Sequence, residues 1–366
     1  MKNGQQNKHL SWFKVENFKC FEAFEMEDIG QFNLIFGDNN TGKTTVLEAL
    51  MFDERNFNQF LFNLYTSLSI RGLFDEKKIP NLVLDTRIFK SFTNINSEQS
   101  KSKFYYSTNL FKQTKNEIHI EFTRVEHISQ SMITHLKRNT LTNDLPKSIV
   151  IFHYKDKDYP FSAMYQENMN SPYSYIPYIS FGDTYRDDLV PFYSNIQDST
   201  KQKKRFIQSL SLFIDKIEDI EISASYSNEP HIAIRFNNSD RPVPLAMLGD
   251  GAKRLFRILV ELPICKHRRL MIDEIDTGIH YSRFKDFWKT ILVAAKENDV
   301  QIFATTHNKD GLRYFYEALE ELPEYQQDAR CFTLSRIKDD SVKSYTQTYE
   351  QFEHALHYDI EIRGRQ

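Results

Sequence analysis

The chain has 366 residues, 40% of them hydrophobic and 14% aromatic, with a formal net charge of −3. This composition supports a large hydrophobic core and excludes a collagenous, mucin-like or mainly disordered protein. The charge balance also excludes a dedicated nucleic-acid coat protein. No run of about 18 uncharged apolar residues occurs, and Cys20, Cys265 and Cys331 are too scattered for a zinc site or a disulfide framework. We therefore expect a cytoplasmic protein with no membrane partner.

The N-terminal 50 residues have the pattern of strands followed by a glycine loop. Residues 11–27 alternate apolar and polar positions and predict two strands joined by a turn near Asn17–Lys19. A third strand is predicted at Phe32–Phe36, and the apolar stretch that begins at Val46 predicts a helix. The local order is therefore strand, glycine loop, helix.

The middle of the chain, roughly residues 52–199, is rich in aromatic residues and has no sustained heptad pattern. For the tract Ser171–Tyr193, rich in Tyr and Pro, we favour buried strand and turn material over a loop that covers a site. Three strands and one helix are predicted here, at Lys103–Ser107, Glu117–Val125, Ser148–Tyr154 and Ile128–Lys137.

Regular alternation of helices and strands returns after Thr200. The predicted helices are Lys204–Ile214, Ala252–Leu262 and Ser282–Glu297. The predicted strands are Ile217–Ser225, His231–Phe236, Arg269–Ile272 and Val300–Ala304, followed by a hairpin of Cys331–Ile337 and Val342–Thr348 around Asp339 and Asp340 and a short helix to about Leu356. This order is typical of an α/β protein.

The strongest motif satisfies G-x-x-x-x-G-K-[ST] between the predicted strand and helix. It comprises Gly37, Asp38, Asn39, Asn40, Thr41, Gly42, Lys43 and Thr44. Phosphate oxygens need backbone N–H donors at a helix N-terminus, and glycines let the loop approach closely. The Lys43 ammonium then neutralises the β- and γ-phosphates, and the Thr44 hydroxyl is offered to Mg²⁺. The motif therefore predicts a nucleotide phosphate site.

Two adjacent carboxylates follow the apolar strand Arg269–Ile272. A phosphate loop needs an acidic partner for its metal, and we assign Asp273 to the Mg²⁺ shell. Glu274 then orients and deprotonates the attacking water as general base.

A second glycine loop, Gly249-Asp250-Gly251, stands immediately before a predicted helix. Two glycines at a helix start form another anion-binding N-terminus. One ATP cannot easily occupy two such helix ends, which suggests that this loop serves the nucleotide of a second subunit.

A histidine, His307, follows the predicted strand Val300–Ala304 and Thr305-Thr306. We expect its imidazole at the same catalytic edge, where it could hydrogen-bond the γ-phosphate or the attacking water. Asn308-Lys309-Asp310 resembles the start of a guanine-binding N-K-x-D motif, but position 311 is Gly, which removes the specificity element of a GTPase.

These motifs, in this order, resemble the ABC-type ATPases of the SMC, RecF and OLD group, and more narrowly the stand-alone AAA-type ATPases of anti-phage systems such as PARIS, Septu and retrons. The resemblance covers residues 11–50 and 200–360 well and the middle poorly. It implies an α/β fold with an ABC-type (RecA-like) nucleotide-binding core. Residues 1–50 would form an N-terminal antiparallel β subdomain with Walker A, 51–200 an inserted mixed α/β segment, and 201–366 the C-terminal half of the core.

The resemblance also assigns roles to residues. It implies Walker A at Gly37–Thr45, including Thr45, the signature loop at Leu248–Arg254, Walker B at Asp273 and Glu274, the D-loop acid at Asp276 and the switch histidine at His307. ATP and Mg²⁺ are the implied cofactors. The usual signature serine is replaced here by Gly249, and the Q-loop glutamine is not located.

By the same resemblance the protein is a homodimer or higher oligomer in which each Walker site is completed by the other subunit's signature loop. The implied biology is anti-phage defence, where the ATPase senses a phage-derived trigger and controls an effector nuclease of Toprim-like or HNH type. Two alternatives stay open: a slowly hydrolysing ATP-dependent scaffold, favoured by Gly249, and a RecF-like DNA-repair ATPase whose partner is duplex nucleic acid.

Chain lengths argue against two related classes, and the signature motif and aromatic insert argue against a third. Gly249 follows Gly42 by 207 positions without heptads, too few for a long-armed SMC protein. Only 59 residues follow His307, too few for the Toprim domain of an OLD-type nuclease. Transporter subunits usually carry LSGGQ and lack this aromatic insert.

Overall fold

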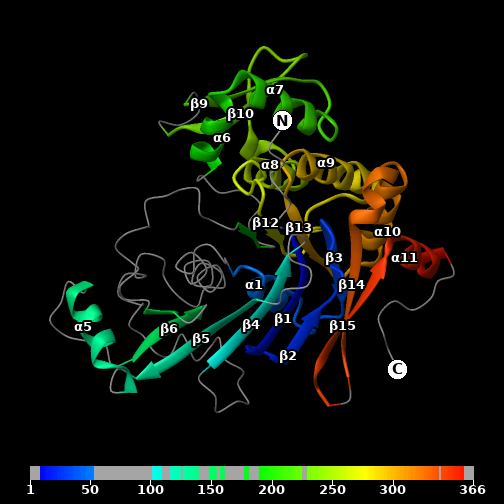
Figure 1. The fold of residues 1–366 in the computed structure, drawn as a ribbon. Coiled ribbons are helices and arrows are strands. Elements are labelled where there is room, and N and C mark those ends of the chain that lie inside the picture. The colour runs from blue at the N-terminus through cyan, green and yellow to red at the C-terminus, as the bar shows by residue number, and fades with distance from the viewer. Residues whose placement is uncertain are drawn as a thin grey trace, which may run out of the picture.

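A computed structural model describes residues 9–52, 101–108, 116–124, 127–139, 148–154, 157–160, 177–180, 189–224, 229–337 and 339–357. These residues form an α/β fold with three sheets, in which a central sheet lies between helices and a second, antiparallel sheet (Figure 1). None of the described helices is long and apolar enough to cross a membrane.

The central sheet has the strand order β15-β14-β3-β13-β12-β8. Its members are β15 (Val342–Thr348), β14 (Ala329–Arg336), β3 (Phe32–Gly37), β13 (Gln301–Thr306), β12 (Arg269–Ile272) and β8 (Tyr178–Ile179). Neighbouring strands are parallel except for the hairpin of β14 and β15. All residues of β3, β12 and β13 are buried, as expected for parallel strands covered on both faces. Parallel pairing brings the carboxyl ends of these strands to one edge.

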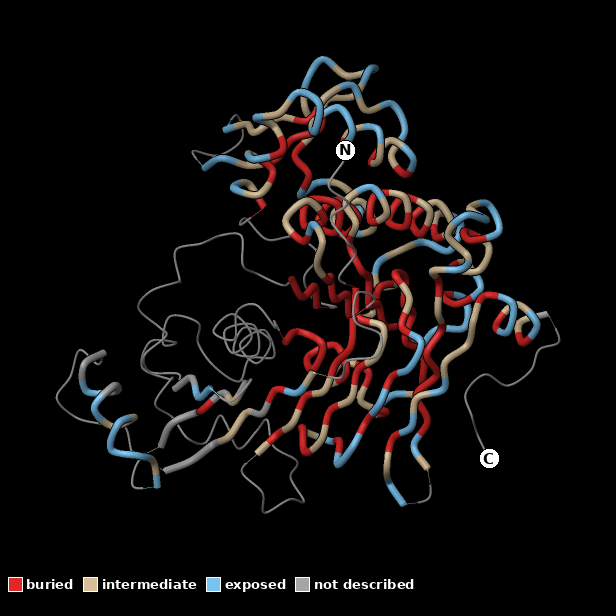
Figure 2. Tube along the Cα trace, viewed as in Figure 1, coloured by how far each residue is buried: buried red, intermediate tan, exposed pale blue. Residues whose placement is uncertain are grey.

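Helices cover both faces of the central sheet (Figure 1). On one face α1 (Lys43–Ala49) packs in a core cluster with Ile35 of β3. On the other face α8 (Asp250–Glu261), α9 (Phe284–Glu297) and α10 (Lys309–Glu320) share a cluster with Leu34 and Phe36. Alternate residues of β3 therefore serve two cores, and Figure 2 shows buried residues concentrated in the central sheet and the helices beside it.

The second sheet joins N-terminal strands to strands of the middle segment. Its order is β2-β1-β4-β5-β6-β7, all antiparallel. Its members are β1 (Leu10–Phe18), β2 (Phe21–Met26), β4 (Lys101–Thr108), β5 (Asn116–Arg124), β6 (Ser148–Tyr154) and β7 (Lys157–Pro160), with α5 at Gln130–Asn139. The predicted strands in both segments are confirmed within one or two residues, except that Val125 lies outside the described residues.

The remaining elements form a small layer beyond α8. They are α6 (Leu189–Gln197), α7 (Thr200–Ser211), the strands β9 (Ile217–Ser223), β10 (His231–Phe236) and β11 (Val243–Pro244), and the 3-10 turn η5 (Leu245–Met247). Figure 1 shows this layer above α8 and α9. Two further elements flank the β14–β15 hairpin in the chain: η7 (Pro323–Asp328) precedes β14, and α11 (Tyr349–His357) follows β15.

Several boundaries differ from the sequence-based predictions for local reasons. The helix predicted from Lys204 begins at Thr200, because the Ser199 side chain caps it. The helix predicted from Ser282 begins at Phe284, after the 3-10 turn η6 (Tyr281–Arg283). The hairpin turn is confirmed at Asp339 and Asp340, where Asp340 has φ 64°.

The tract Ser171–Tyr193 is described only in part. Residues 177–180 contain the short buried strand β8, and residues 189–193 begin α6. The strand β8 agrees with the prediction of buried strand material, whereas residues 189–193 belong to a partly buried helix that the prediction did not include. The rest of the tract lies outside the described residues.

One buried ion pair fixes α1 to the antiparallel sheet. Lys19, in the turn between β1 and β2, donates from Nζ to Glu48 Oε2 at 2.6 Å. The Glu48 side chain is completely buried and that of Lys19 is 11% exposed. Burial removes both charges from most of the solvent, so each needs the other.

Because Glu48 would be left with a buried charge, Lys19→Met is expected to lower the free energy of unfolding by about 3 kcal/mol. The double variant Lys19→Met with Glu48→Leu is expected to lose less than Lys19→Met alone. Urea denaturation of the three proteins measures both effects, and a double variant as unstable as the single one would contradict the expected role of the uncompensated charge.

Candidate nucleotide site

The first glycine motif forms a tight loop between β3 and α1. Gly42 caps α1 with φ 88°, and Asn40 has φ 64°, so both adopt the left-handed conformation. A Cβ at Gly42 would lie 2.9 Å from the ring of Phe21. Lys43 Nζ donates to the carbonyl oxygens of Gly37 and Asp38, each at 2.8 Å. Two carbonyl oxygens of the loop therefore fix the position of the ammonium group.

The charge environment of Lys43 joins the predicted site residues. Burial lowers the pKa of Lys43 below its ordinary value, and four carboxylates act against this shift. In decreasing order of effect they belong to Asp273, Glu274, Asp38 and Asp276. The structure thus places the predicted Walker B and D-loop acids close enough to the predicted Walker A lysine to oppose the lowering of its pKa.

Asp273 follows β12 and accepts three hydroxyl hydrogen bonds. Thr44 Oγ1 donates to Oδ2 at 2.9 Å, and Tyr178 donates to the same oxygen at 3.0 Å. Thr305 Oγ1, on β13, donates to Oδ1 at 2.6 Å. The carboxylate is therefore held in one orientation beside the N-terminus of α1, and Thr44 and Asp273, which the sequence predicts as Mg²⁺ ligands, lie in hydrogen-bond contact.

Glu274 stands next to this carboxylate in an unusual backbone conformation. Its φ is 46°, in the left-handed region that is costly for a residue with a side chain. Its backbone N–H donates to Thr305 Oγ1 at 2.8 Å, and the next N–H, of Ile275, donates to the Thr305 carbonyl at 2.9 Å. These bonds fix the turn that presents the half-buried Glu274 side chain.

Arg254 is a site residue whose role sequence reasoning missed. It lies on α8 and is fully buried, and its guanidinium donates to three backbone carbonyls. NH1 donates to Ser180 at 3.0 Å, and NH2 donates to Asp273 at 2.6 Å and to Glu274 at 3.1 Å. The signature helix is thereby bound directly to the ends of β8 and β12.

The second glycine loop packs against the segment after Asp276. Gly278 has φ 77°, and a Cβ there would lie 3.0 Å from Asp250 Cβ. A Cβ at Gly251 would lie 3.3 Å from the Gly278 carbonyl oxygen, whereas a Cβ at Gly249 would meet nothing within 4 Å. The signature loop therefore has one close-packed side and one open position.

His307 lies just beyond β13 and is exposed. The residues after it have structural roles: Thr306 Oγ1 accepts from the Asn308 N–H at 3.0 Å, and the Asn308 side chain accepts from the Asp310 N–H at 2.9 Å. Asn308 therefore caps α10. This helix cap accounts for the Asn and Asp that resemble a guanine-binding motif.

The donor set at this edge fits Mg²⁺ bound with a nucleotide. Mg²⁺ usually takes one or two protein oxygens and completes its shell with phosphates and water. Thr44 Oγ1 and the Asp273 carboxylate, already 2.9 Å apart, supply such oxygens. Within the described ranges no group of three or more His, Cys, Asp and Glu side chains could hold a metal alone, so phosphate and water would complete the shell.

Arg336 is a second residue that the sequence did not reveal. It ends β14 and donates from NH2 to the Asn40 carbonyl at 3.0 Å. Its only sequence signal is a basic residue at the end of a predicted strand. The contact ties the β14–β15 hairpin to the phosphate loop.

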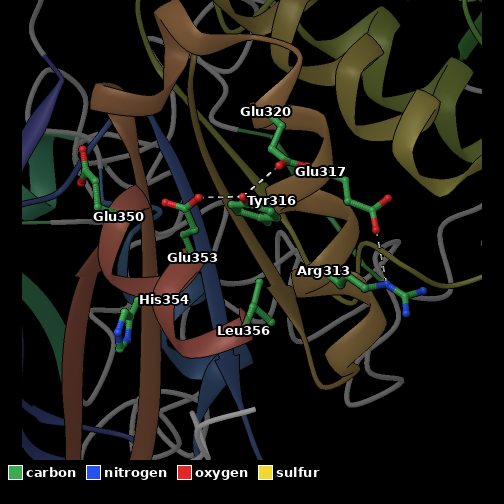
Figure 3. A pocket seen from close by; sticks show the side chains of 8 residues that line it. All are labelled: Arg313, Tyr316, Glu317, Glu320, Glu350, Glu353, His354 and Leu356. Atoms are coloured by element: carbon green, nitrogen blue, oxygen red, sulfur yellow. Dashed lines mark hydrogen bonds and ion pairs between the residues drawn. The ribbon is translucent and has the colours of Figure 1, made fainter. Parts of the chain in front are cut away.

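A cavity of about 570 Å³ lies away from the motifs and is lined by residues of α10 and α11 (Figure 3). Its lining includes four glutamates, and the Tyr316 hydroxyl lies 3.0 Å from Glu320 Oε1 and 2.9 Å from Glu353 Oε1. Burial raises the pKa of Tyr316, and the carboxylates reinforce this shift. The cavity supplies no group to the nucleotide edge.

A parallel sheet with a phosphate loop, a paired acidic edge and a signature helix defines a nucleotide-binding ATPase head. Residues 32–312 match the family described as "AAA domain, putative AbiEii toxin, Type IV TA system". Because the match covers more than half of the chain, the protein belongs to this AAA-domain family and is an ATPase of the AAA type.

Individual relatives agree with this classification. A curated protein of Helicobacter pylori named "ATP/GTP phosphatase" is 23% identical over 361 residues, covering 92% of this chain and 94% of the relative. Two solved SMC heads show the same fold at 11% identity. One, bound to the C-winged helix domain of ScpA, has a TM-score of 0.51 and covers 94% of this chain and 99% of that chain. The other, from Pyrococcus furiosus and bound to the C-terminal domain of ScpA, has a TM-score of 0.50, with 96% and 99% covered.

Replacing Arg254 tests whether its guanidinium holds the catalytic edge together. Arg254→Met is expected to lower the free energy of unfolding by about 3 kcal/mol, because three buried carbonyls lose a charged donor. Lys253→Met, on the same helix turn, removes only the pair with Asp250 and is expected to cost at most about 1 kcal/mol. Urea denaturation measures both, and equal costs would contradict this role.

Proposed function

We propose that the protein binds ATP with Mg²⁺ and hydrolyses it at the edge formed by the phosphate loop and the end of β12. The observation that carries this proposal is the Asp273 carboxylate, held by hydroxyls of Thr44, Tyr178 and Thr305 beside the N-terminus of α1. Such an arrangement joins a phosphate cradle to a metal-binding acid.

Each residue then has a defined task. Backbone N–H groups of Gly37–Thr45 bind phosphate oxygens, and Lys43 neutralises the negative charge that develops on them. Thr44 and Asp273 hold the metal, which when bound neutralises phosphate charge. Glu274, whose backbone is fixed by Thr305, orients a water molecule and accepts its proton. His307, at the end of the neighbouring strand, senses the γ-phosphate.

The second glycine loop supports a head-to-tail dimer around ATP. Gly249 has open space around it and stands at the N-terminus of α8, where backbone N–H groups attract an anion. Gly249, Asp250 and Gly251 would contact the γ-phosphate bound to the other subunit, with Asp276 beside them. Two solved SMC heads are described with a bound ScpA domain, which agrees with a head that works through protein partners.

The proposed biology is anti-phage defence. The description of the matched family names a putative AbiEii toxin and a toxin–antitoxin system, which supports a toxin-like or effector-linked role. In this proposal the ATPase responds to a phage-derived trigger and controls an effector nuclease of Toprim-like or HNH type. Coexpression of the neighbouring open reading frame, with phage plating as the readout, tests this role; full plating efficiency in the presence of both proteins would count against it.

Steady-state ATP hydrolysis tests the enzymatic proposal. Glu274→Gln is expected to lower kcat by about 10²- to 10⁴-fold with nucleotide binding retained, because the variant cannot accept a proton from water. Lys43→Ala is expected to lose nucleotide binding, because the cradle loses its cation.

The same assay separates the enzyme from a slowly hydrolysing scaffold. Phosphate release by the unchanged protein should exceed that of Glu274→Gln under conditions where both bind ATP fully. Equal near-zero rates with intact binding would refute hydrolysis and favour the scaffold.

Gly249→Ser tests the dimer. A serine fits there because an added Cβ has no neighbour within 4 Å, and its hydroxyl adds a donor toward a facing phosphate. We expect a higher dimer fraction with ATP in the Glu274→Gln background, measured by sedimentation. Gly251→Ser is the matched control, since its Cβ would crowd Ile279 at 3.2 Å; a dimer fraction unchanged by Gly249→Ser would argue against a signature loop that faces ATP.

A further inference from the structure

The carboxyl end of β8 lies directly beside the metal-binding acid. β8 pairs with β12 in parallel, with Tyr178 opposite Met271 and Ile179 opposite Ile272. The Asp273 N–H donates to the Ile179 carbonyl at 2.8 Å. Ser180, the next residue, therefore stands at the same edge as Asp273.

The Ser180 side chain is buried, and the described residues around it do not satisfy the hydrogen-bonding capacity of its hydroxyl. The residue is 4% exposed, and among the described parts of the chain its Oγ has no hydrogen-bond partner. Its backbone is firmly held, because its carbonyl accepts from Arg254 at 3.0 Å. A buried hydroxyl without a partner is unfavourable unless a ligand or water supplies one.

Ser180 directly follows β8, which ends at Ile179. Residues two apart in an extended chain share a face, so β8 continued by one residue places Ser180 on the face of Tyr178. The Tyr178 hydroxyl reaches Asp273 Oδ2, the oxygen that also accepts from Thr44. The unsatisfied hydroxyl therefore belongs to the face on which the Mg²⁺ ligands meet.

We propose that Ser180 Oγ hydrogen-bonds a water molecule of the divalent metal's shell, and that Tyr178 positions Asp273 for the same metal. This inference rests on the proposed nucleotide site and deepens it. The site offers the metal two protein oxygens, so most of its shell is phosphate and water, and those waters need fixed hydrogen-bond partners. Ser180, directly after β8, supplies one such partner. The sequence did not locate a Q-loop glutamine that could take this role.

The metal dependence of nucleotide binding tests the proposal directly. Binding of a fluorescent, non-hydrolysable ATP analogue is titrated with Mg²⁺, and Mn²⁺ bound with the analogue is observed by electron paramagnetic resonance. Ser180→Ala is expected to raise the Mg²⁺ concentration at half-maximal binding by about 10-fold or more, the usual range for a lost outer-shell partner. Analogue binding without metal should not change.

Thermal unfolding without ligands supplies a readout that separates this role from a structural one. Because Ser180→Ala removes a buried hydroxyl with no described partner, its melting temperature should equal or exceed that of the unchanged protein. Should Ser180→Ala fail to fold, Ser180→Cys nearly keeps the volume with a much weaker hydrogen-bonding group and carries the same expectation for Mg²⁺.

Thr333→Val is the matched control. Thr333, on β14 of the same sheet, is also buried, and its Oγ1 has no hydrogen-bond partner in the described part of the chain. Its neighbours Phe332 and Leu334 belong to the core on the α1 side, so Thr333 faces the opposite side. Thr333→Val should leave the Mg²⁺ concentration at half-maximal analogue binding unchanged.

The outcomes are distinct for this inference and for the proposed function. A Ser180→Ala protein with the Mg²⁺ midpoint and resonance spectrum of the unchanged protein overturns the inference and leaves the ATPase proposal standing. Absence of any metal-dependent analogue binding by the unchanged protein overturns both.

Discussion

The edge of the sheet at the carboxyl ends of β8 and β12 depends on one buried guanidinium. Arg254 enters from α8 and binds the carbonyls of Ser180, Asp273 and Glu274, which end two neighbouring strands. Arginine suits this position because its planar fork donates in several directions and keeps its charge when buried. The carbonyls would otherwise be unpaired at the point where parallel strands stop and their ladder hydrogen bonds run out. A single side chain therefore connects α8 to the ends of β8 and β12.

Much of the site was predictable because its chemistry is local in sequence. The phosphate loop needs a strand, two glycines and a helix within a short stretch, and the structure has β3, Gly37, Gly42 and α1 in that order. Walker B needs only an apolar strand followed by acids. Arg254 and Tyr178 were not identified as contacts because these contacts are long-range: Tyr178 and Asp273 are 95 positions apart. The strand that contains Tyr178 has two residues, too few for any alternation to show.

The antiparallel sheet contains strands of the middle segment, so this segment helps to support the site. β4 pairs with β1 along most of its length, so a strand of the middle segment completes the sheet that supports α1. Phe21 of β2 lies under Gly42, and Lys19 reaches Glu48 on α1. Sequence pattern predicted the turn-linked strands β1 and β2 but not the pairing of β4 with β1, because the pairing of distant strands depends on complementary faces that alternation alone does not specify. The shape of the phosphate loop thus depends on residues from both segments.

The hydrogen bonds of Lys43 limit how many contacts its side chain can make to a nucleotide. An ammonium group has three protons, and two of them already bind the carbonyls of Gly37 and Asp38 at 2.8 Å. One proton remains for a phosphate oxygen while the loop keeps this shape. The attraction of Lys43 for phosphate is then mainly that of a fixed positive charge, whose orientation the loop has determined before any nucleotide arrives. Recognition of phosphate geometry consequently falls to the backbone N–H groups of the loop.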